Sequence, residues 1–257
     1  MALISLEGYS VLVTGGGSGI GAGTAKYLAD RGAKVTISGR RREKLQHTAE
    51  TLGHNVRAVV GDVTVEADRQ RMLDVALEHG GGLDGLVNNA GNMYRGALDT
   101  LEQDALAEIF QTNVIGAMLL TGLAKDALAR SSGAVVFLGS IHNRRAFPGA
   151  SPYAATKGAV EALTRSLAAE LGADGIRVNC VCPGAVFTEI NQRAGLFSDE
   201  EAHARLEGMS GLHALGRIGE VEEVAEAIEY CLCARWTTGA ILDVDGGLGL
   251  GLTPDAS

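Results

Sequence analysis

The sequence predicts an α/β protein in which a mostly parallel, seven-stranded sheet carries helices on both faces. Short runs rich in Val and Ile alternate along the chain with longer stretches of helical composition. This alternation indicates strand–helix–strand units, whose parallel strands are buried between two helical layers. Of the 257 residues, 46% are hydrophobic and 36 are Gly, which allows a large core and tight turns. We expect a single domain over residues 1–257.

A glycine-rich loop follows the first expected strand. That strand is Ser10–Thr14; a helix is expected at Ala22–Arg31 and a second strand at Lys34–Ser38. This order is typical of a Rossmann-type dinucleotide-binding fold, in which glycine N–H groups and the helix N-terminus bind a pyrophosphate. The cofactor-binding residues expected in this loop are Gly15, Gly17, Ser18, Gly19, Ile20 and Gly21.

The same alternation continues to the end of the chain. Further strands are expected at Val56–Val60, Gly85–Val87, Ala134–Leu138, Arg177–Cys182 and Ala240–Val244. Further helices are expected at Glu66–His79, Leu101–Arg130, Pro152–Gly172 and Val221–Cys233, the second of which is long enough to contain a break. We interpret residues 186–215 as a lid over the substrate and residues 250–257 as a loose tail.

Composition and charge argue against several classes of protein. The formal net charge is −9 without a long basic run, which disfavours nucleic acid or an anionic membrane as a partner. No apolar run approaches the ~20 residues of a membrane span, and a signal-peptide pattern is absent, so we expect a cytoplasmic protein. The pairs Cys180/Cys182 and Cys231/Cys233 are spaced as CxC, a poor match to zinc sites, so no metal is expected.

Three polar side chains form a candidate catalytic set. Tyr153 and Lys157 are four residues apart, so a helix would place both on one face. An ammonium beside a phenol favours the phenolate, which brings proton exchange closer to neutral pH. Ser140 follows an expected strand, at the sheet edge where ligands bind. Taken singly, each is more simply a turn residue, a core tyrosine or a solvated lysine; their joint spacing on a nucleotide fold favours chemistry.

The motifs together resemble those of the short-chain dehydrogenase/reductase family. TGGGSGIG stands at Thr14–Gly21, NNAG at Asn88–Gly91 and YAATK at Tyr153–Lys157, with Asn113, Ser140 and Pro183-Gly184 between and after them. The resemblance covers nearly the whole chain in the family's order. It implies nicotinamide-dependent interconversion of a secondary alcohol and a ketone, and a homotetramer whose interface uses the two longest helices.

Site roles follow from the resemblance. It implies that Tyr153 is the general acid/base, that Ser140 holds the substrate oxygen and that Lys157 binds the nicotinamide ribose. It implies that the backbone of Asn113 holds a water leading toward Lys157. The remaining cofactor contacts that we expect are Asp62, Val63, Asn89, Ala90, Gly91, Pro183, Gly184, Val186 and Thr188.

The end of the second strand favours NADP(H) over NAD(H). An NAD site commonly has an acidic residue here, but this chain has Gly39, followed by Arg40 with Arg41 and Arg42 behind it. The guanidinium offers a charge-assisted contact to a 2′-phosphate. A solvated helix start is the alternative interpretation of the arginines, and Ser18 stands where some NADP-using relatives have a basic residue, so NAD stays possible.

The substrate stays open at this level. His142 is either a substrate contact or a loop surface residue, and Arg144 and Arg145 either recognise an acidic substrate or face solvent. Family members that reduce carrier-bound acyl groups tend to have basic residues around the mouth of the site, where we expect Ser131 and Asp174. Alternative functions are a nucleotide-sensing or scaffold protein without turnover, a 3-oxoacyl thioester reductase, and an epimerase or dehydratase.

Overall fold

The computed structural model describes residues 5–187 and 207–251. Thr188, most of the expected lid and nearly all of the expected tail lie outside them. Within the described residues, seven strands form one parallel sheet in the order β3-β2-β1-β4-β5-β6-β7, which confirms the predicted fold class. The strands are β1 (Ser10–Thr14), β2 (Lys34–Gly39), β3 (Val56–Val60), β4 (Gly85–Asn88), β5 (Ala134–Leu138), β6 (Arg177–Pro183) and β7 (Ile241–Val244).

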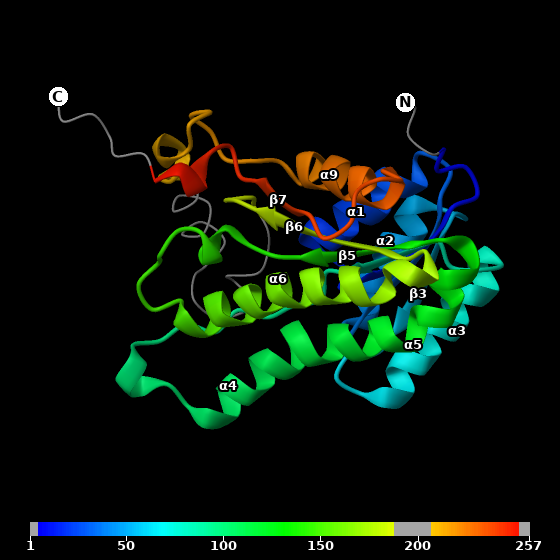
Figure 1. The fold of residues 1–257 in the computed structure, drawn as a ribbon, viewed down its shortest axis with the longest axis horizontal. Coiled ribbons are helices and arrows are strands. Elements are labelled where there is room, and N and C mark those ends of the chain that lie inside the picture. The colour runs from blue at the N-terminus through cyan, green and yellow to red at the C-terminus, as the bar shows by residue number, and fades with distance from the viewer. Residues whose placement is uncertain (1–4, 188–206, 252–257) are drawn as a thin grey trace.

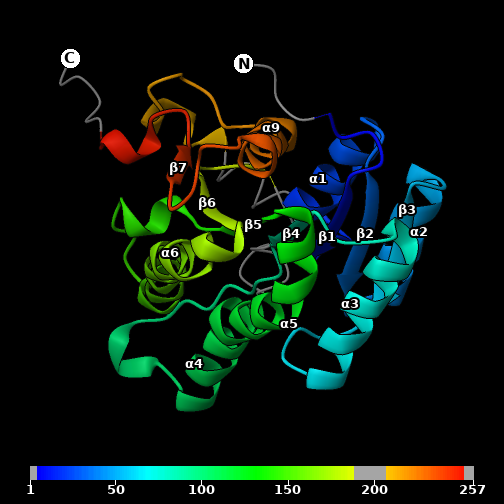
Figure 2. The ribbon, with the colours of Figure 1, turned by 45° about the vertical axis from the view of Figure 1, so that its right-hand side comes forward.

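Helices cover both faces of the sheet, as Figures 1 and 2 show. Side chains alternate along each strand, so every strand contributes to both cores. In β5, Phe137 belongs to one core cluster and Val136 to the other. The first cluster packs under α3 (Glu66–Gly80), α5 (Gly116–Ser131) and α6 (Ser151–Leu171), and the second under α1 (Gly19–Ala29), α2 (Arg42–Leu52) and α9 (Val221–Cys233).

Most predicted elements agree with the structure within a few residues, and β1, β3, β5 and α9 begin and end where they were predicted. Helix α2 was not predicted. Its residues are mostly polar, and its apolar stripe is short: Leu45 is buried, whereas Ala49 and Leu52 are only partly buried against the core. The helix is held by the neighbouring strands rather than by its own pattern.

The long helix predicted at Leu101–Arg130 is broken at a π-helical turn. α4 (Gln103–Phe110) leads into the π turn Gln111–Ile115, and α5 follows directly. A π turn adds a residue to the helical repeat and often occurs at functional sites. Here the turn buries Asn113, which is 3% exposed. The predicted break therefore exists, and it places a candidate site residue.

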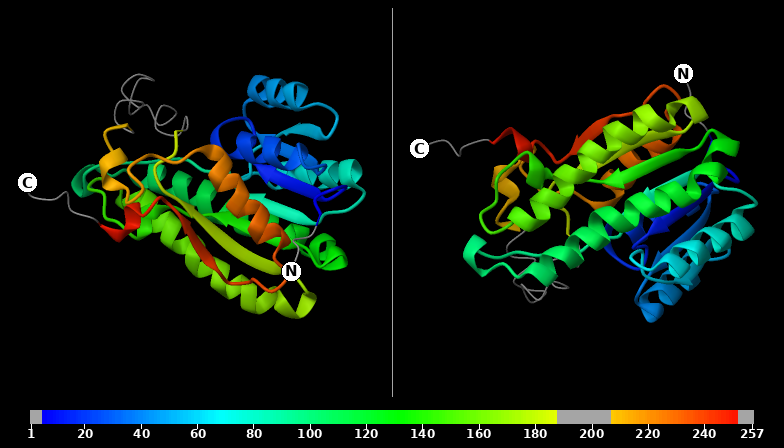
Figure 3. Two further views of the ribbon diagram at one scale, coloured as in Figure 1. Left: turned by 90° about the horizontal axis from the view of Figure 1, so that it is seen from above. Right: turned by 60° about the horizontal axis from the view of Figure 1, so that its bottom comes forward.

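Helices α5 and α6 lie side by side along one face of the sheet (Figure 3). Among the described residues, the stretch Gln103–Ser131 is long enough for a membrane span and contains an 18-residue window with a mean hydropathy of 1.3. Leu120 and Ala124 of this stretch are nevertheless fully buried in the core beneath α5. Packing against the sheet thus explains why the inward-facing residues of this stretch are apolar.

Truncation of Phe137 should destabilise the fold strongly. This ring is 1% exposed in the core cluster beneath α5 and α6. We expect Phe137→Ala to lower the free energy of unfolding by about 3–5 kcal/mol, because apolar contacts are lost and a cavity remains. Urea unfolding measures this. The control Leu98→Ala removes a side chain that is 83% exposed and should change stability by less than about 0.5 kcal/mol; equal losses would contradict the core assignment.

Candidate active site

Two adjoining cavities lie beyond the carboxyl ends of the strands. The larger has an empty volume of about 1300 Å³, including its open mouth, and the smaller about 650 Å³. They share four residues that follow β1 and β4, namely Gly15, Ser18, Ala90 and Gly91. The pair therefore forms one elongated site around the glycine-rich loop, as the location of ligands in open parallel sheets leads one to expect.

The structure places most predicted site residues along these cavities. Besides the four shared residues, those lining the larger cavity are Gly19, Ile20, Asn89, Ser140, His142, Tyr153, Lys157, Pro183, Gly184 and Val186. Those lining the smaller cavity are Gly17, Arg40, Asp62 and Val63. Gly21 and Asn113 line neither of the two cavities described here.

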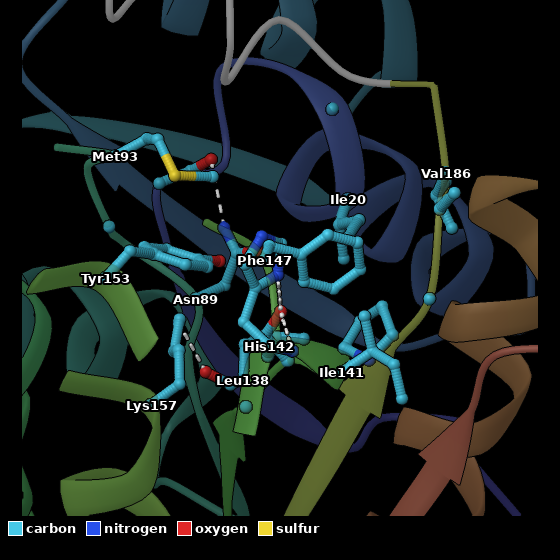
Figure 4. Close-up of a pocket in the computed structure, with 18 of the residues that line it drawn as sticks. Ile20, Asn89, Met93, Leu138, Ile141, His142, Phe147, Tyr153, Lys157 and Val186 are labelled. Carbon is cyan, nitrogen blue, oxygen red and sulfur yellow. Dashed lines mark hydrogen bonds between the residues drawn. The ribbon is translucent and has the colours of Figure 1, made fainter. Parts of the chain in front are cut away.

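Ser140, Tyr153 and Lys157 meet in the larger cavity. Figure 4 shows Tyr153 and Lys157 there, with Lys157 reaching toward Leu138. Ser140 directly follows β5, and the other two stand one turn apart on α6. All three are less than 10% exposed. The Lys157 Nζ donates to the carbonyl oxygen of Leu138 at 2.6 Å and lies 5.5 Å from the centre of the Tyr153 ring. The sheet and the helix together bring a hydroxyl, a phenol and an ammonium to one place.

The side chain of Asn113 connects three segments behind the cavity. Its Oδ1 accepts from the backbone N–H of Asn92 at 2.8 Å, and its Nδ2 donates to the Asn92 carbonyl at 3.0 Å. Nδ2 also donates to Oγ1 of Thr156, which is the neighbour of Lys157, at 3.1 Å. The side chain thus has a structural role, and a water held by its backbone stays a prediction.

Asn89 and Gly21 give the glycine-rich loop its shape. Nδ2 of Asn89 donates to the carbonyl oxygens of Thr14, at 2.7 Å, and Gly15, at 3.3 Å. A Cβ on Gly21 would lie 2.4 Å from both the Gly15 oxygen and this Nδ2, so only glycine fits there. Gly21 is buried behind the loop and supports it from within, and its predicted contact with the cofactor stays a prediction.

Two arginines line the smaller cavity, one more than was predicted. Arg40 Nη1 lies 3.8 Å from an Asp62 carboxylate oxygen. Arg41 Nη2 donates to Oγ of Ser18 at 2.7 Å, so it lies beside the glycine-rich loop. In the sequence, Arg41 is one of the basic residues behind Arg40. Only its position next to Arg40 indicated that it could line the site.

His142 lines the larger cavity rather than the outer surface of its loop, and its contact with a substrate stays a prediction. Its Nδ1 lies 3.1 Å from Oγ of Ser140. Its ring is edge-on to Tyr153, with 5.0 Å between ring centres, and packs on Phe147 at 4.5 Å. Burial, together with the positive charges of Arg95 and Lys157, lowers the pKa of His142 to about 4. The imidazole is therefore neutral at physiological pH.

Glu161 anchors the loop that carries His142, and the sequence reasoning missed it. Its carboxylate, on a side chain 7% exposed, accepts from Arg144 Nη1 at 3.0 Å and from the Asn143 amide. Arg144 also pairs with Asp243 at 3.4 Å, and Arg145 donates to the carbonyl oxygen of Leu248. The positive charge of Arg144 is thus paired with carboxylates of the protein itself. The available signal was spacing, since Glu161 continues the four-residue repeat of Tyr153 and Lys157.

The residues present fit a dinucleotide. Helix α1 begins at the glycine-rich loop without a side-chain cap and without an acidic residue in its first turn, which leaves its positive end to an anion. Ser38 lines the smaller cavity. Its Oγ is buried and has no hydrogen-bond partner among the described residues. An unpaired buried hydroxyl is costly and marks a place for a ligand group.

Comparison with known proteins agrees with this site. The family model described as "Enoyl-(Acyl carrier protein) reductase" matches residues 15–249. Carbonyl reductase family member 4 of Danio rerio is 36% identical over 240 residues, 93% of this chain and 97% of the relative. The 3-oxoacyl-[acyl-carrier-protein] reductase of Mus musculus is 36% identical over 239 residues, with the same two coverages.

Solved structures agree as well. The crystal structure of 3-ketoacyl-(acyl-carrier-protein) reductase from Brucella melitensis, complexed with NADH, superimposes with a TM-score of 0.88. It is 32% identical and is matched over 95% of this chain and all of that one. The fold and site thus define a nicotinamide-dependent oxidoreductase. The chain belongs to the short-chain dehydrogenase/reductase family.

The low pKa of His142 should make stability depend on pH. An unfolded histidine titrates near ~6.5, but the folded protein binds this proton only near pH 4, so the unfolded state binds more protons between these values. We expect stability to fall, by roughly 3 kcal/mol, as the pH drops through this window. Urea unfolding from pH 7 to 4 measures the slope.

The slope should be smaller in His142→Asn than in the wild type, because the titrating group is absent. His54, exposed at the opposite end of the sheet, provides the matched control: His54→Asn should keep the wild-type slope. Parallel slopes for wild type and His142→Asn would show that His142 is not the group responsible.

Proposed function

We propose that the protein is an NADP(H)-dependent reductase that interconverts ketones and secondary alcohols. The observation that carries this proposal is the meeting of Ser140, Tyr153 and Lys157 in a cavity that continues into a dinucleotide-shaped groove. A protein that only senses or scaffolds nucleotides has no need of this trio. The nucleotide-sensing alternative is therefore not favoured.

Each member of the trio has a definite task. During reduction, Tyr153 donates its hydroxyl proton to the substrate oxygen, and Ser140 holds that oxygen by a hydrogen bond. The nicotinamide, when bound, supplies or accepts the hydride. Lys157 uses one N–H for the Leu138 carbonyl, and its remaining donors are available to ribose hydroxyls. Its positive charge stabilises negative charge developing on Tyr153.

NADP(H) is the cofactor that we propose. Gly39 ends β2 without a carboxylate that would repel a 2′-phosphate, and Arg40 and Arg41 both line the adjoining cavity. The contact of Arg41 with Ser18 directs a guanidinium toward the glycine-rich loop. Ser18 is not basic, but Arg41 supplies positive charge at the same place. NAD(H) is the alternative, because Asp62 lies within 3.8 Å of Arg40 and offsets part of its charge.

The walls of the larger cavity suit an apolar substrate of medium size. Its apolar lining comes from the loops after β4, β5 and β6 and from the C-terminal segment, including Met93, Ile141, Phe147, Val186, Met209 and Leu248. We propose a ketone with an apolar substituent as the substrate. Arg144 is neutralised by Glu161 and Asp243, so it does not favour an acidic one.

A 3-oxoacyl thioester is the second candidate substrate. Two of the named relatives are described as reductases of carrier-bound 3-oxoacyl groups. Ser131 and Asp174 were expected at the mouth of the site, and their lack of positive charge weighed against this class. The structure places Asp174, which pairs with Lys125, beyond the far end of α6, about 30 Å along that helix from Tyr153. Ser131 likewise ends α5. Within one copy of the chain, the lack of positive charge at these two residues therefore does not argue against a carrier-bound substrate in this cavity.

We propose that the assembly is a homotetramer located in the cytoplasm. The outward side of α5 exposes Met118, Leu119 and Leu123 by 38–50%, and Trp236 is fully exposed after α9. Exposed apolar side chains at two separate places fit two kinds of contact between copies of the chain. The cysteines, all four buried and free, fit a reducing compartment.

Replacing the Tyr153 hydroxyl should abolish most of the activity. We expect Tyr153→Phe to lower kcat/KM for ketone reduction at least about 100-fold, because the proton donor is lost. NADPH absorbance measures turnover with a panel of ketones. Tyr230→Phe, which removes an equivalent hydroxyl from an exposed tyrosine of α9, should keep wild-type activity. Full activity in Tyr153→Phe would refute the assignment of the acid.

The two arginines should determine cofactor preference. We expect Arg41→Ala, and Arg40→Ala combined with Gly39→Asp, to weaken NADPH binding about tenfold or more while sparing NADH, since each removes a charge-assisted bond to the 2′-phosphate. Fluorescence titration with both cofactors measures the ratio. Arg42→Ala is the control, because Arg42 is exposed and lines neither cavity. An unchanged ratio in the first two variants would exclude NADP(H) preference through these residues.

A further inference from the structure

The hydroxyl of Ser140 lies next to two nitrogen atoms of His142. Oγ accepts from the backbone N–H of His142 at 3.3 Å. The ring Nδ1 of the same residue lies 3.1 Å from Oγ. A serine hydroxyl has one hydrogen to donate and two lone pairs with which to accept. What Ser140 can offer a substrate therefore depends on how His142 uses these groups.

The tautomer of His142 decides where the serine hydrogen points. If Nδ1 has no hydrogen, it accepts the Ser140 hydrogen, and the oxygen of a substrate ketone, which can only accept, receives no hydrogen bond from Ser140. If Nδ1 carries the hydrogen, it donates to Oγ. Both lone pairs of Oγ are then occupied by His142, and the hydroxyl hydrogen is left for the substrate. Only the second arrangement lets Ser140 polarise a carbonyl.

We propose that His142 is a positioning residue that donates from Nδ1 to Ser140 and thereby directs the serine hydrogen toward the substrate oxygen. This inference rests on the proposed ketone reduction and adds a residue to it. His142 acts through Ser140 rather than on the reacting atoms. It follows that the pair, rather than the serine alone, supplies the electrophilic hydrogen bond of the site.

The surroundings of His142 hold the ring in this orientation. Phe147 packs on one side, with ring centres 4.5 Å apart, and the Tyr153 ring stands edge-on at 5.0 Å. The next two residues, Asn143 and Arg144, are bound to the buried Glu161 carboxylate, which fixes the loop against α6. A fixed ring costs no reorganisation when the transition state forms.

The charge state of the ring fits the same role. Arg95 and Lys157 are the positively charged groups that act on it, and with burial they keep the pKa of His142 near 4. A neutral imidazole has one N–H, and the choice between its two nitrogens is set by hydrogen bonding. Ser140 is the partner that the structure provides for Nδ1.

A double-mutant cycle between His142 and Ser140 tests the inference. His142→Phe keeps a packed ring without a donor, and His142→Asn keeps an amide N–H near the position of Nδ1. We expect His142→Phe to lower kcat by roughly 5-fold to 10-fold, the effect of one lost hydrogen bond between neutral groups, Nδ1–H to Oγ. We expect His142→Asn to recover most of this loss, and both variants to keep the wild-type Kd for NADPH.

The decisive result is the effect of His142→Phe when Ser140 is already Ala. If His142 acts through the serine hydroxyl, the second substitution lowers the residual kcat by less than about twofold, because coupled residues do not add. If the two losses multiply, His142 acts independently of Ser140 and the inference is overturned. Loss of activity in His142→Asn equal to that in His142→Phe also overturns it, because a donor would then be irrelevant.

Nitrogen chemical shifts of the protein labelled with ¹⁵N-histidine give a readout without turnover. Hydrogen on Nδ1 supports the inference, and hydrogen on Nε2 refutes it. This readout separates the inference from the proposed function. If the wild type reduces no ketone but Nδ1 carries the hydrogen, the proposed ketone reduction is refuted, whereas the hydrogen bond from His142 to Ser140 is not. His54→Asn, at an exposed site far from the cavity, should leave kcat unchanged.

Discussion

The need to pair polar groups on the inward face of α6 organises the site. Tyr153, Lys157 and Glu161 follow one another at intervals of a single turn, and all three are nearly buried. Buried charges are costly unless they are paired. Lys157 therefore bonds to the end of β5, and Glu161 binds the Arg144 guanidinium from the loop that follows. These two bonds draw strand, loop and helix together, and Tyr153 and Lys157 both line the cavity beside them.

The cofactor groove is shaped by a second constraint, close approach of backbone to backbone. Gly21 leaves no room for a Cβ against Gly15 and Asn89, and Asn89 holds the loop by its side-chain amide. With α1 uncapped, the positive end of the helix is available to phosphate oxygens. The same loop meets Arg41 through Ser18, so the residues that we propose for phosphate binding and for cofactor choice lie in one small region.

Much of this could be predicted from local patterns. Alternating apolar runs predicted the strands because parallel strands are buried on both faces, and the rule for strand ends brought Ser140 to Tyr153 and Lys157. The glycine-rich loop predicted the cofactor groove, because glycine N–H groups at a helix N-terminus bind a pyrophosphate. Helix α2 was not predicted, because its apolar stripe is short and only Leu45 in it is fully buried. Spacing also could not show that Gly21 supports the loop from behind, because that depends on a contact with Asn89 far along the chain.

The sequence by itself determined the class of fold and the family, and it predicted the candidate catalytic set, because these depend on periodicity and on short motifs. Only the tertiary structure decided what the residues between those motifs do. Folding pairs Arg144 with Glu161, places Arg41 on Ser18, sets His142 against Ser140, and puts Asp174 beyond the far end of α6. Each of these outcomes depends on the meeting of segments or on the path of a loop, and such contacts leave no period in the sequence.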